Sequence, residues 1–281
     1  MIRCRIRVLS ENTASGLGIM GEHGLSFWIE RGSKRILFDT GQGFVLENNA
    51  RRLGIQLEDV DEVILSHGHY DHTGGLLPVL ERSPSVPVFA HPKALEPKYA
   101  ARTGRPGRYI GMPEETMRIL KGSKSWMAVE EKTATPGGMI LTGPIARRTP
   151  YEDTGGRFYL DEECQEEDPM KDDQAAYLDT PQGLVVLLGC AHAGIVNTLE
   201  AILEQTQGRP VHTVIGGAHL VNASKERIAK TTEHLRKLDV QDLRLAHCTG
   251  FEASCFLWNA LPGRCSPLPA GSQMEFTLRS S

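Results

Sequence analysis

The hydrophobic positions along this chain follow two periods. Short apolar runs rich in β-branched residues are typical of buried strands, whereas apolar residues three or four positions apart are typical of helices. The pattern predicts helices at Phe44–Leu53, Gly74–Glu81, Ile195–Gln205 and Lys225–Leu238, the last with Ser224 as its N-cap. It predicts strands at Arg5–Leu9, Ser26–Glu30, Ile36–Asp39, Glu62–Ser66, Val86–Ala90, Met139–Thr142, Ala175–Asp179, Leu184–Leu188, Val211–Ile215, Leu243–Ala246 and Met274–Leu278. This alternation favours sheets covered by helices, a layered α/β sandwich.

Two stretches interrupt the pattern and are predicted to be loops. Residues 152–173 hold ten acids against Arg157 and Lys171, and we expect them to be solvated surface. Residues 98–108 hold no acid, and their glycines and proline favour turns. This basic stretch is either solvated surface or a loop that closes over an anionic substrate. Its cations are Lys98, Arg102, Arg105 and Arg108.

Composition places the chain among ordinary globular proteins, with 40% hydrophobic and 23% charged residues in 281. A net charge of −4 argues against a nucleic-acid or anionic-membrane partner, and no apolar run reaches the length of a membrane span. Six scattered cysteines without a C-x-x-C pair predict reduced thiols in the cytoplasm. Cys190 and Cys248 lie within two residues of a histidine, and we expect them to be small buried fillers beside a site.

The most informative segment is Val63–Gly75, where a buried strand runs into four candidate metal ligands. A turn allowed by the glycines that follow the strand lets all four side chains converge. Neutral imidazoles suit zinc, and a set that mixes histidine with aspartate also admits iron or manganese. Packing four such groups together for stability alone would be costly. The sequence therefore predicts a metal site formed by His67, His69, Asp71 and His72.

Three more histidines, His192, His219 and His247, each follow a predicted strand. Because ligands gather beyond the carboxyl ends of strands in open α/β sheets, we expect His192 and His247 to complete the site. Asp39 ends another strand, where it either orients a ligand histidine or closes its own turn. The remaining histidines are weaker candidates: His23 and His91 could face or support the site, and His212 and His234 are expected to be ordinary strand and helix residues.

These residues resemble the metallo-β-lactamase superfamily, whose signature is H-x-H-x-D-H after a strand. The resemblance implies a four-layer αββα sandwich formed as a single domain over residues 1–281. It implies one metal ion held by His67, His69 and His192 and a second held by Asp71, His72 and His247. The superfamily usually adds a bridging aspartate where this chain reads Gly216–His219. Either water alone bridges the metals, one site is weak, or His219 contacts metal or substrate.

Further segments resemble the branch that contains the archaeal 7,8-dihydropterin-6-methyl-4-(β-D-ribofuranosyl)aminobenzene-5′-phosphate synthases and many metal-dependent hydrolases. The segments that carry this resemblance are Glu22–Ser26, Phe38–Gln42, Asp172–Ala175, Gly189–Asn197, Gly216–Leu220 and His247–Gly250.

The predicted activity is hydrolysis of a small anionic ester or phosphoester by a metal-bound hydroxide, with one or two divalent ions, zinc foremost. Asp71 would orient the water, His219 and Thr249 would stabilise an oxyanion or phosphate, and Arg105 and Arg108 would bind a remote phosphate. One alternative is a transferase that joins a pyrophosphorylated hydroxymethylpterin to an aryl amine. Another is a non-catalytic metal-dependent sensor or a diiron reductase, against which His69 counts. The oligomeric state stays open.

Overall fold

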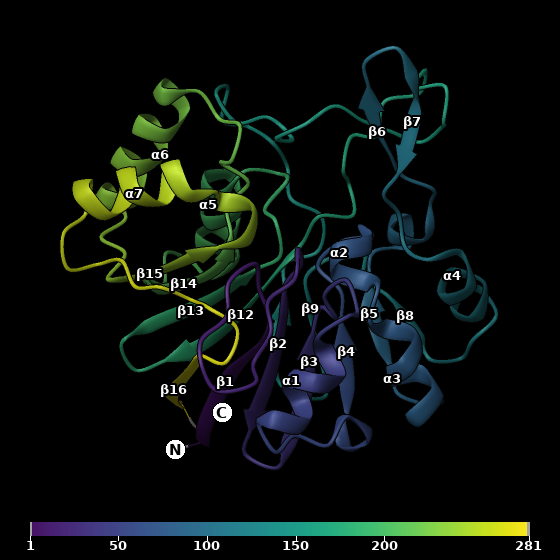
Figure 1. Cartoon of the computed structure of the whole chain (residues 1–281). Helices are drawn as coiled ribbons and strands as arrows, with labels where there is room; N and C mark the ends of the chain where they lie inside the picture. The colour runs from purple at the N-terminus through teal and green to yellow at the C-terminus, as the bar shows by residue number, and fades with distance from the viewer. Residues whose placement is uncertain (1, 280–281) are drawn as a thin grey trace.

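The computed structural model describes residues 2–279, and two large β-sheets form its centre (Figure 1). In the first sheet the strand order is β16-β1-β2-β3-β4-β5-β8, with β3, β4, β5 and β8 parallel. The strands of this sheet are β1 (Ile2–Ser10), β2 (Ser26–Arg31), β3 (Lys34–Phe38), β4 (Glu62–Ile64), β5 (Val88–Ala90), β8 (Trp126–Ala128) and β16 (Gln273–Leu278).

The second sheet has the strand order β15-β14-β13-β12-β10-β9, with β13, β14 and β15 parallel. Its strands are β9 (Thr133–Ala134), β10 (Ile140–Leu141), β12 (Ala175–Thr180), β13 (Gly183–Leu188), β14 (Val211–Gly217) and β15 (Asp242–Ala246). A small third sheet, ordered β11-β6-β7, projects beyond the sandwich (Figure 1). Its strands are β6 (Tyr99–Arg102), β7 (Arg105–Tyr109) and β11 (Phe158–Tyr159).

The helices lie on the two outer faces. One side carries α1 (Leu46–Arg52), α3 (Leu76–Arg82) and α4 (Glu114–Lys121), and the other carries α5 (Ile195–Gln205), α6 (Lys225–Lys237) and α7 (Phe251–Ala260). The short α2 (Tyr70–Thr73) and 3₁₀ turns η1 (Leu57–Asp59), η2 (Pro92–Leu95) and η3 (His247–Thr249) lie in connections. Among residues 2–279, no helix combines the length and the apolar character needed to cross a membrane.

Three apolar clusters define the layers. The central cluster joins side chains of both sheets, such as Phe38 and Leu187. A second cluster packs α5, α6 and α7 against the outer face of β12–β15, and a third packs α1, α3 and α4 against the outer face of the first sheet. Because each sheet buries both of its faces, its central strands are apolar on both sides, as the continuous runs in the sequence indicate. The architecture is the predicted four-layer αββα sandwich.

Each predicted strand overlaps an observed strand, and the predicted helices correspond to α1, α3, α5 and α6. The Ser224 hydroxyl accepts a hydrogen bond from the Arg227 N–H, as the predicted N-cap requires. The pattern did not predict α4 and α7. The loop prediction for residues 98–108 was wrong, because these residues form the β6–β7 hairpin. Most of the hairpin is exposed, so its strands lack the apolar alternation by which a strand is identified.

Candidate metal centre

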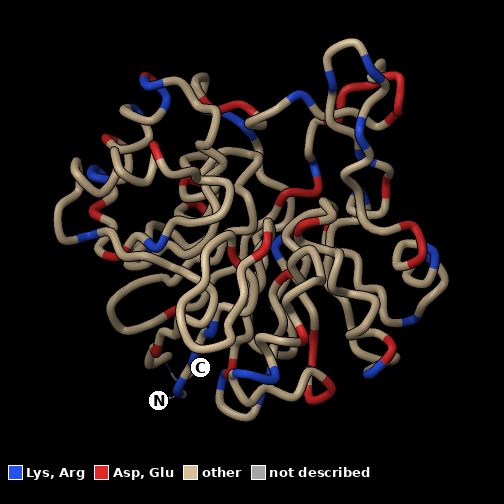
Figure 2. The backbone as a smooth tube through the Cα atoms, viewed as in Figure 1, with Lys and Arg blue, Asp and Glu red and all other residues tan. Residues whose placement is uncertain are grey.

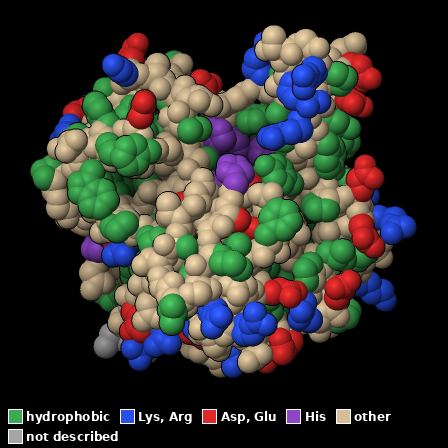
Figure 3. Space-filling model, viewed as in Figure 1, with side chains coloured by type: hydrophobic (Ala, Val, Ile, Leu, Met, Phe, Trp, Pro, Cys, Tyr) green, Lys and Arg blue, Asp and Glu red, His purple; other side chains and the backbone are tan. Residues whose placement is uncertain are grey.

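The predicted ligands gather where parallel strands of both sheets end. His67, His69, Asp71 and His72 follow β4 of the first sheet, and His192 and His247 follow β13 and β15 of the second. Figure 3 shows histidines in a hollow beside the basic hairpin. This hollow is the mouth of a cavity of about 790 Å³, which His69, Asp71, His192, His219 and His247 help to line.

His67, His69 and His192 form a compact group in which one ligand nitrogen of each lies within 4.8 Å of the others. His67 Nε2 and His69 Nδ1 are 3.0 Å apart. Burial lowers the pKa of His69 to about 3, and burial with the neighbouring histidines holds the pKa of His67 and His192 well below the ordinary value. The three rings are therefore neutral at pH 7, the state in which imidazole binds a metal.

Two ring nitrogens of this group have no hydrogen-bond partner among residues 2–279 and are suited to bind a metal ion. The His192 ring is held through Nδ1, which lies 2.8 Å from the Thr154 carbonyl oxygen. Its Nε2, and the Nε2 of His69, are buried and have no hydrogen-bond partner among residues 2–279. Buried polar atoms without partners are rare because they cost free energy. A divalent ion bound by the three rings would remove that cost.

Asp71, His72 and His247 form the second half of the cluster. Asp71 Oδ2 lies 3.3 Å from His247 Nε2 and 3.9 Å from His72 Nε2. His23 adds its Nε2 at 3.2 Å from the same oxygen, so this weak candidate does face the site. Burial alone would raise the pKa of Asp71, but the surrounding His72, His23 and His247 hold it well below its usual range. Asp71 is thus an ionised carboxylate at pH 7, the state in which it binds a metal ion.

Asp39 makes the predicted contact with a ligand histidine. Its Oδ2 lies 2.7 Å from His72 Nδ1, and the carboxylate also accepts from the Ser66 backbone N–H at 2.7 Å. All three groups are buried. Burial would lower the pKa of His72, but the carboxylates of Asp39 and Asp71 raise it. The contact directs His72 Nε2 towards the centre of the cluster, as buried carboxylates do for metal-binding histidines.

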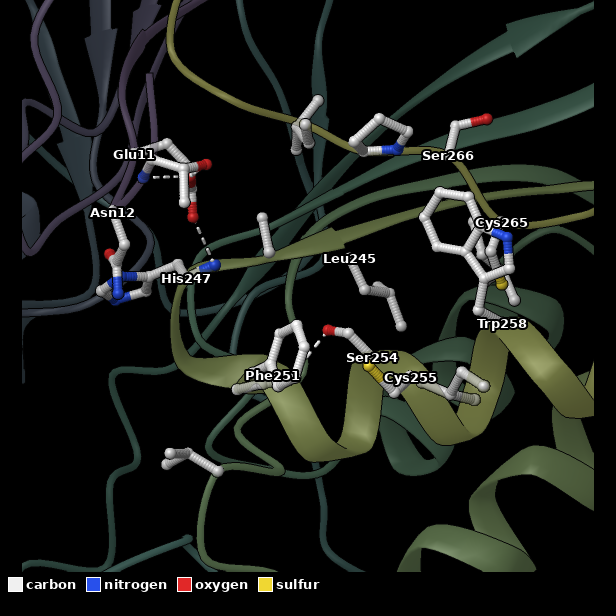
Figure 4. A pocket seen from close by; sticks show the side chains of 18 of the residues that line it. Glu11, Asn12, Leu245, His247, Phe251, Ser254, Cys255, Trp258, Cys265 and Ser266 are labelled. Carbon is white, nitrogen blue, oxygen red and sulfur yellow. Dashed lines mark hydrogen bonds between the residues drawn. The ribbon is translucent and has the colours of Figure 1, made fainter. Parts of the chain in front are cut away.

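Two residues of the loop after β1 hold His247. The Glu11 carboxylate accepts from the His247 backbone N–H at 2.8 Å, and Asn12 Oδ1 lies 2.8 Å from His247 Nδ1 (Figure 4). Nε2 is then left for the cluster. Behind His247 lies a second, largely apolar cavity of about 620 Å³, lined by α7 and β15 residues such as Phe251, Leu245 and Trp258. The sequence pattern gave no sign of the roles of Glu11 and Asn12.

His219 lines the cavity, with its ring centroid 4.3 Å from that of His192. Its Nδ1 is buried without a hydrogen-bond partner in the part of the chain described, so a contact to metal or substrate stays a prediction. Thr249 was wrongly placed against the substrate. The η3 turn buries it, and its hydroxyl accepts from the Ala218 N–H instead of lining the cavity.

The other histidines lie outside the centre. His91 is half-buried, and its Nδ1 accepts from the Lys93 N–H at the start of η2. His212 lies beside the Thr213 hydroxyl, and His234 lies 2.7 Å from the Glu200 carboxylate. His212 and His234 are ordinary strand and helix residues, as predicted.

The cations of the basic hairpin that face the cavity are only partly the ones that the sequence predicted. Arg102 and Arg108 line the cavity together with Arg157, whereas Arg105 lies at the exposed turn and does not line it. Along the backbone of the hairpin lie Lys and Arg positions, with Asp and Glu positions beside them (Figure 2). Lys98 is fully buried, and its Nζ donates to Asp168 at 2.8 Å and to Asp172 at 3.0 Å. Since it is paired inside the protein, Lys98 is not a substrate-binding cation.

The acidic stretch is only partly the solvated surface that we expected. Asp172 accepts from the Gly68 N–H at 2.8 Å, between two ligand histidines, and Asp173 accepts from the Ala193 N–H at 2.8 Å, next to a third. Glu152 accepts from two N–H groups at the start of α5. Burial raises the pKa of Asp173 to about 7. These carboxylates position the loops of the centre, a role that depends on partners distant in the sequence.

This chain belongs to the metallo-β-lactamase superfamily. The model of that superfamily matches residues 20–148, which include the H-x-H-x-D-H segment. The fold and the position of the histidine cluster agree with this assignment.

Among the relatives is the 7,8-dihydropterin-6-methyl-4-(β-D-ribofuranosyl)-aminobenzene-5′-phosphate synthase of Methanocaldococcus jannaschii, 33% identical over 267 residues, which are 91% of this chain and 90% of the relative. A crystal structure described as a metal-dependent hydrolase of the β-lactamase superfamily superposes with a TM-score of 0.82 at 33% identity, covering 96% of this chain and 98% of the other. The metallo-β-lactamase-fold protein YhfI from Bacillus subtilis shares the fold at 14% identity, with a TM-score of 0.61 and coverage of 98% and 100%.

Proposed function

We propose that this protein is a metal-dependent hydrolase of small anionic esters or phosphoesters. The observation that carries the proposal is the convergence of six candidate ligands from both sheets, four of which line one cavity. Three of their Nε2 atoms have no hydrogen-bond partner among residues 2–279. His67, His69 and His192 would hold one divalent ion. Asp71, His72 and His247 would hold the other. The similarity to a solved metal-dependent hydrolase supports the same conclusion.

When held by these residues, divalent ions would lower the pKa of bound water to about 7 and would polarise a carbonyl or phosphoryl oxygen. The protein supplies the rest. The Asp71 carboxylate lies at the cavity wall, where it would accept a hydrogen bond from the attacking water and keep it oriented. His219, beside His192, would donate to the developing negative charge on the substrate.

The charge of the cavity wall supports an anionic substrate. Arg102, Arg108 and Arg157 approach from the hairpin and from the neighbouring loop. Arg102 donates to the Pro106 carbonyl and Arg157 to the Tyr159 hydroxyl, whereas Arg108 makes no side-chain hydrogen bond or ion pair within residues 2–279. A guanidinium without a protein partner is free to bind a phosphate or carboxylate through two parallel hydrogen bonds. We therefore place the anionic group of the substrate at Arg108.

The metal content is the direct test. Elemental mass spectrometry on the purified wild type should find two metal ions per chain, chiefly zinc, with iron or manganese as the alternatives that these ligands admit. The His72→Ala and His247→Ala variants should each fall towards one ion, while His212→Ala, the matched control, keeps both. One ion per chain, unaffected by either change, would contradict a dinuclear centre and weaken the hydrolase proposal.

A second candidate is supported by the similarity to the Methanocaldococcus jannaschii synthase. In that case an aryl amine takes the place of water and displaces pyrophosphate from a pyrophosphorylated hydroxymethylpterin. The two candidates differ in product, so the experiment is to supply the pterin and the amine together. A stable pterin–amine adduct, with no hydrolysis of ester or phosphoester substrates, would favour the transferase over the hydrolase.

We also propose that the protein acts in the cytoplasm on a free metabolite, without a nucleic-acid or membrane partner. The six cysteines are unpaired thiols, which suits a reducing compartment. The net charge of −4 disfavours polyanionic partners. The assignment of residues 1–281 to a single domain stays a prediction.

A further inference from the structure

The end of β14 has no room for a metal-binding side chain. A Cβ atom at Gly217 would lie 2.5 Å from Cys248 Sγ and 2.5 Å from the Gly189 carbonyl oxygen. The second of these contacts is to backbone, which cannot rotate away. The bridging acid expected near this position is therefore absent from the sequence and also excluded by the packing. The space between the two halves of the cluster is therefore left to another side chain or to water.

Cys190 occupies that space. It is only 2% exposed, and its Sγ lies 3.1 Å from His72 Nε2. The sulfur is within 4.8 Å of ligand nitrogens of His67 and His72, of His192 and His219, and of His247. It is thus close to both halves of the cluster at once, which is the position of a bridging ligand. Cys248, by contrast, belongs to only one such group within residues 2–279, the one that it forms with Cys190 and His247.

The local backbone turns Cys190 towards the histidines. Ala191, between Cys190 and His192, has a φ of 53°, in the left-handed region that a side chain other than glycine seldom adopts. This conformation lets the side chains on either side of Ala191 reach the same cluster. A cysteine that serves as a small apolar filler is surrounded by apolar atoms. Cys190 instead faces imidazole nitrogens, and Asp39 directs one of them, His72 Nε2, at its sulfur.

We propose that Cys190 is a metal ligand, binding as a thiolate in place of the missing bridging carboxylate. Binding forms a sulfur–metal bond and breaks the S–H bond, and the proton leaves to the solvent through the cavity. The inference rests on the proposed function only in requiring a metal ion at this centre. A thiolate favours zinc or iron over magnesium or manganese, so the ligand also narrows the choice of metal.

Cobalt(II) tests the inference by spectroscopy. The wild type loaded with cobalt(II) chloride should show a thiolate-to-cobalt charge-transfer band in the near ultraviolet. The Cys190→Ser variant should lose the band, and Cys248→Ser, the matched control one position after His247, should keep it. A band that persists in Cys190→Ser and disappears in Cys248→Ser would overturn the assignment. So would the lack of any band in a wild type that binds cobalt.

X-ray absorption on the zinc-loaded wild type needs no variant and covers the case in which Cys190→Ser fails to fold. A sulfur scatterer at about 2.3 Å, besides nitrogen and oxygen at about 2.0–2.2 Å, is expected. A shell of nitrogen and oxygen alone would overturn the inference. If that protein still hydrolyses its substrate, the hydrolase proposal stands and only the role of Cys190 fails. A wild type that binds neither cobalt nor zinc would overturn both.

Discussion

Replacing Lys98 with methionine should destabilise the protein strongly, although the sequence places this residue in an exposed basic loop. The ammonium group is fully buried and bonds two carboxylates, Asp168 and Asp172, whose side chains are 4% and 0% exposed. Methionine keeps the apolar stem but leaves both charges buried without their cation. Removing one partner of a buried ion pair typically costs about 3–5 kcal/mol, and we expect a loss in that range.

Urea unfolding at pH 7 measures this loss, with Lys34→Met as the matched control. Lys34 also faces a carboxylate, at 3.3 Å from Asp61, but its side chain is 44% exposed. Exposed pairs contribute about 1 kcal/mol or less, so the control should change the free energy of unfolding by no more than that. Both variants lose one positive charge, so the effect of net charge cancels. A Lys98→Met loss as small as that of the control would refute the reasoning.

The pH dependence gives a second check. Burial would raise the pKa of Asp172, but Lys98 lowers it, so the contribution of this carboxylate is present above its unfolded pKa of about 3.9 and is lost as the pH falls through the folded value. Without Lys98 the folded pKa rises, and the variant binds a proton as the pH falls. The difference from the wild type should therefore be smaller at pH 5 than at pH 7. If the difference in free energy of unfolding between the wild type and Lys98→Met did not depend on pH, buried carboxylates without a cation could not be its cause.

Three other predictions concern the centre itself. His67→Ala and Asp71→Ala should each abolish metal-dependent turnover with little change in the urea midpoint, while His212→Ala stays active. Equal losses of turnover in all three variants would mean that the metal ligands were assigned wrongly. Asp39→Asn should weaken metal binding about 10–100-fold in a chelator competition, and an unchanged affinity would deny its orienting role. Arg108→Ala should raise KM for a phosphorylated substrate about tenfold, as loss of a charged hydrogen bond implies, but not for a neutral ester.

The H-x-H-x-D-H segment could be predicted from the sequence because its ligands are neighbours along the chain. Their spacing after a buried strand is sufficient to bring them together, whatever the rest of the fold. Asp39, His192 and His247 could also be predicted, because each follows a strand of the pattern and parallel strands end at the same edge. A layered α/β sandwich followed from the same runs of buried residues, and the resemblance to the superfamily implied the αββα order of its layers.

The direction of side chains within the turns could not be predicted in this way. Cys248 and Thr249 are adjacent in sequence, yet Cys248 lines the cavity and Thr249 is buried beneath it. The difference arises in the η3 turn, where His247 has a φ of 53°. The prediction that Lys98 lies in a surface loop failed for another reason. Its burial depends on acids that lie 70 and 74 positions away, and a local pattern carries no signal of such pairs.

Several buried acids of this protein accept hydrogen bonds from the backbone of the loops that carry the ligands. Each of these loops has a backbone N–H that donates to a carboxylate from a distant segment, so the imidazoles hold their places through hydrogen bonds that need no metal. Such bonds to a charged acceptor are roughly twice as strong as neutral ones. Because a side chain is excluded at Gly217, a protein ligand between the two half-sites would come from the ligand loops themselves, where Cys190 lies 3.1 Å from His72. The pairs are Asp39 with Ser66, Asp172 with Gly68, Asp173 with Ala193 and Glu11 with His247.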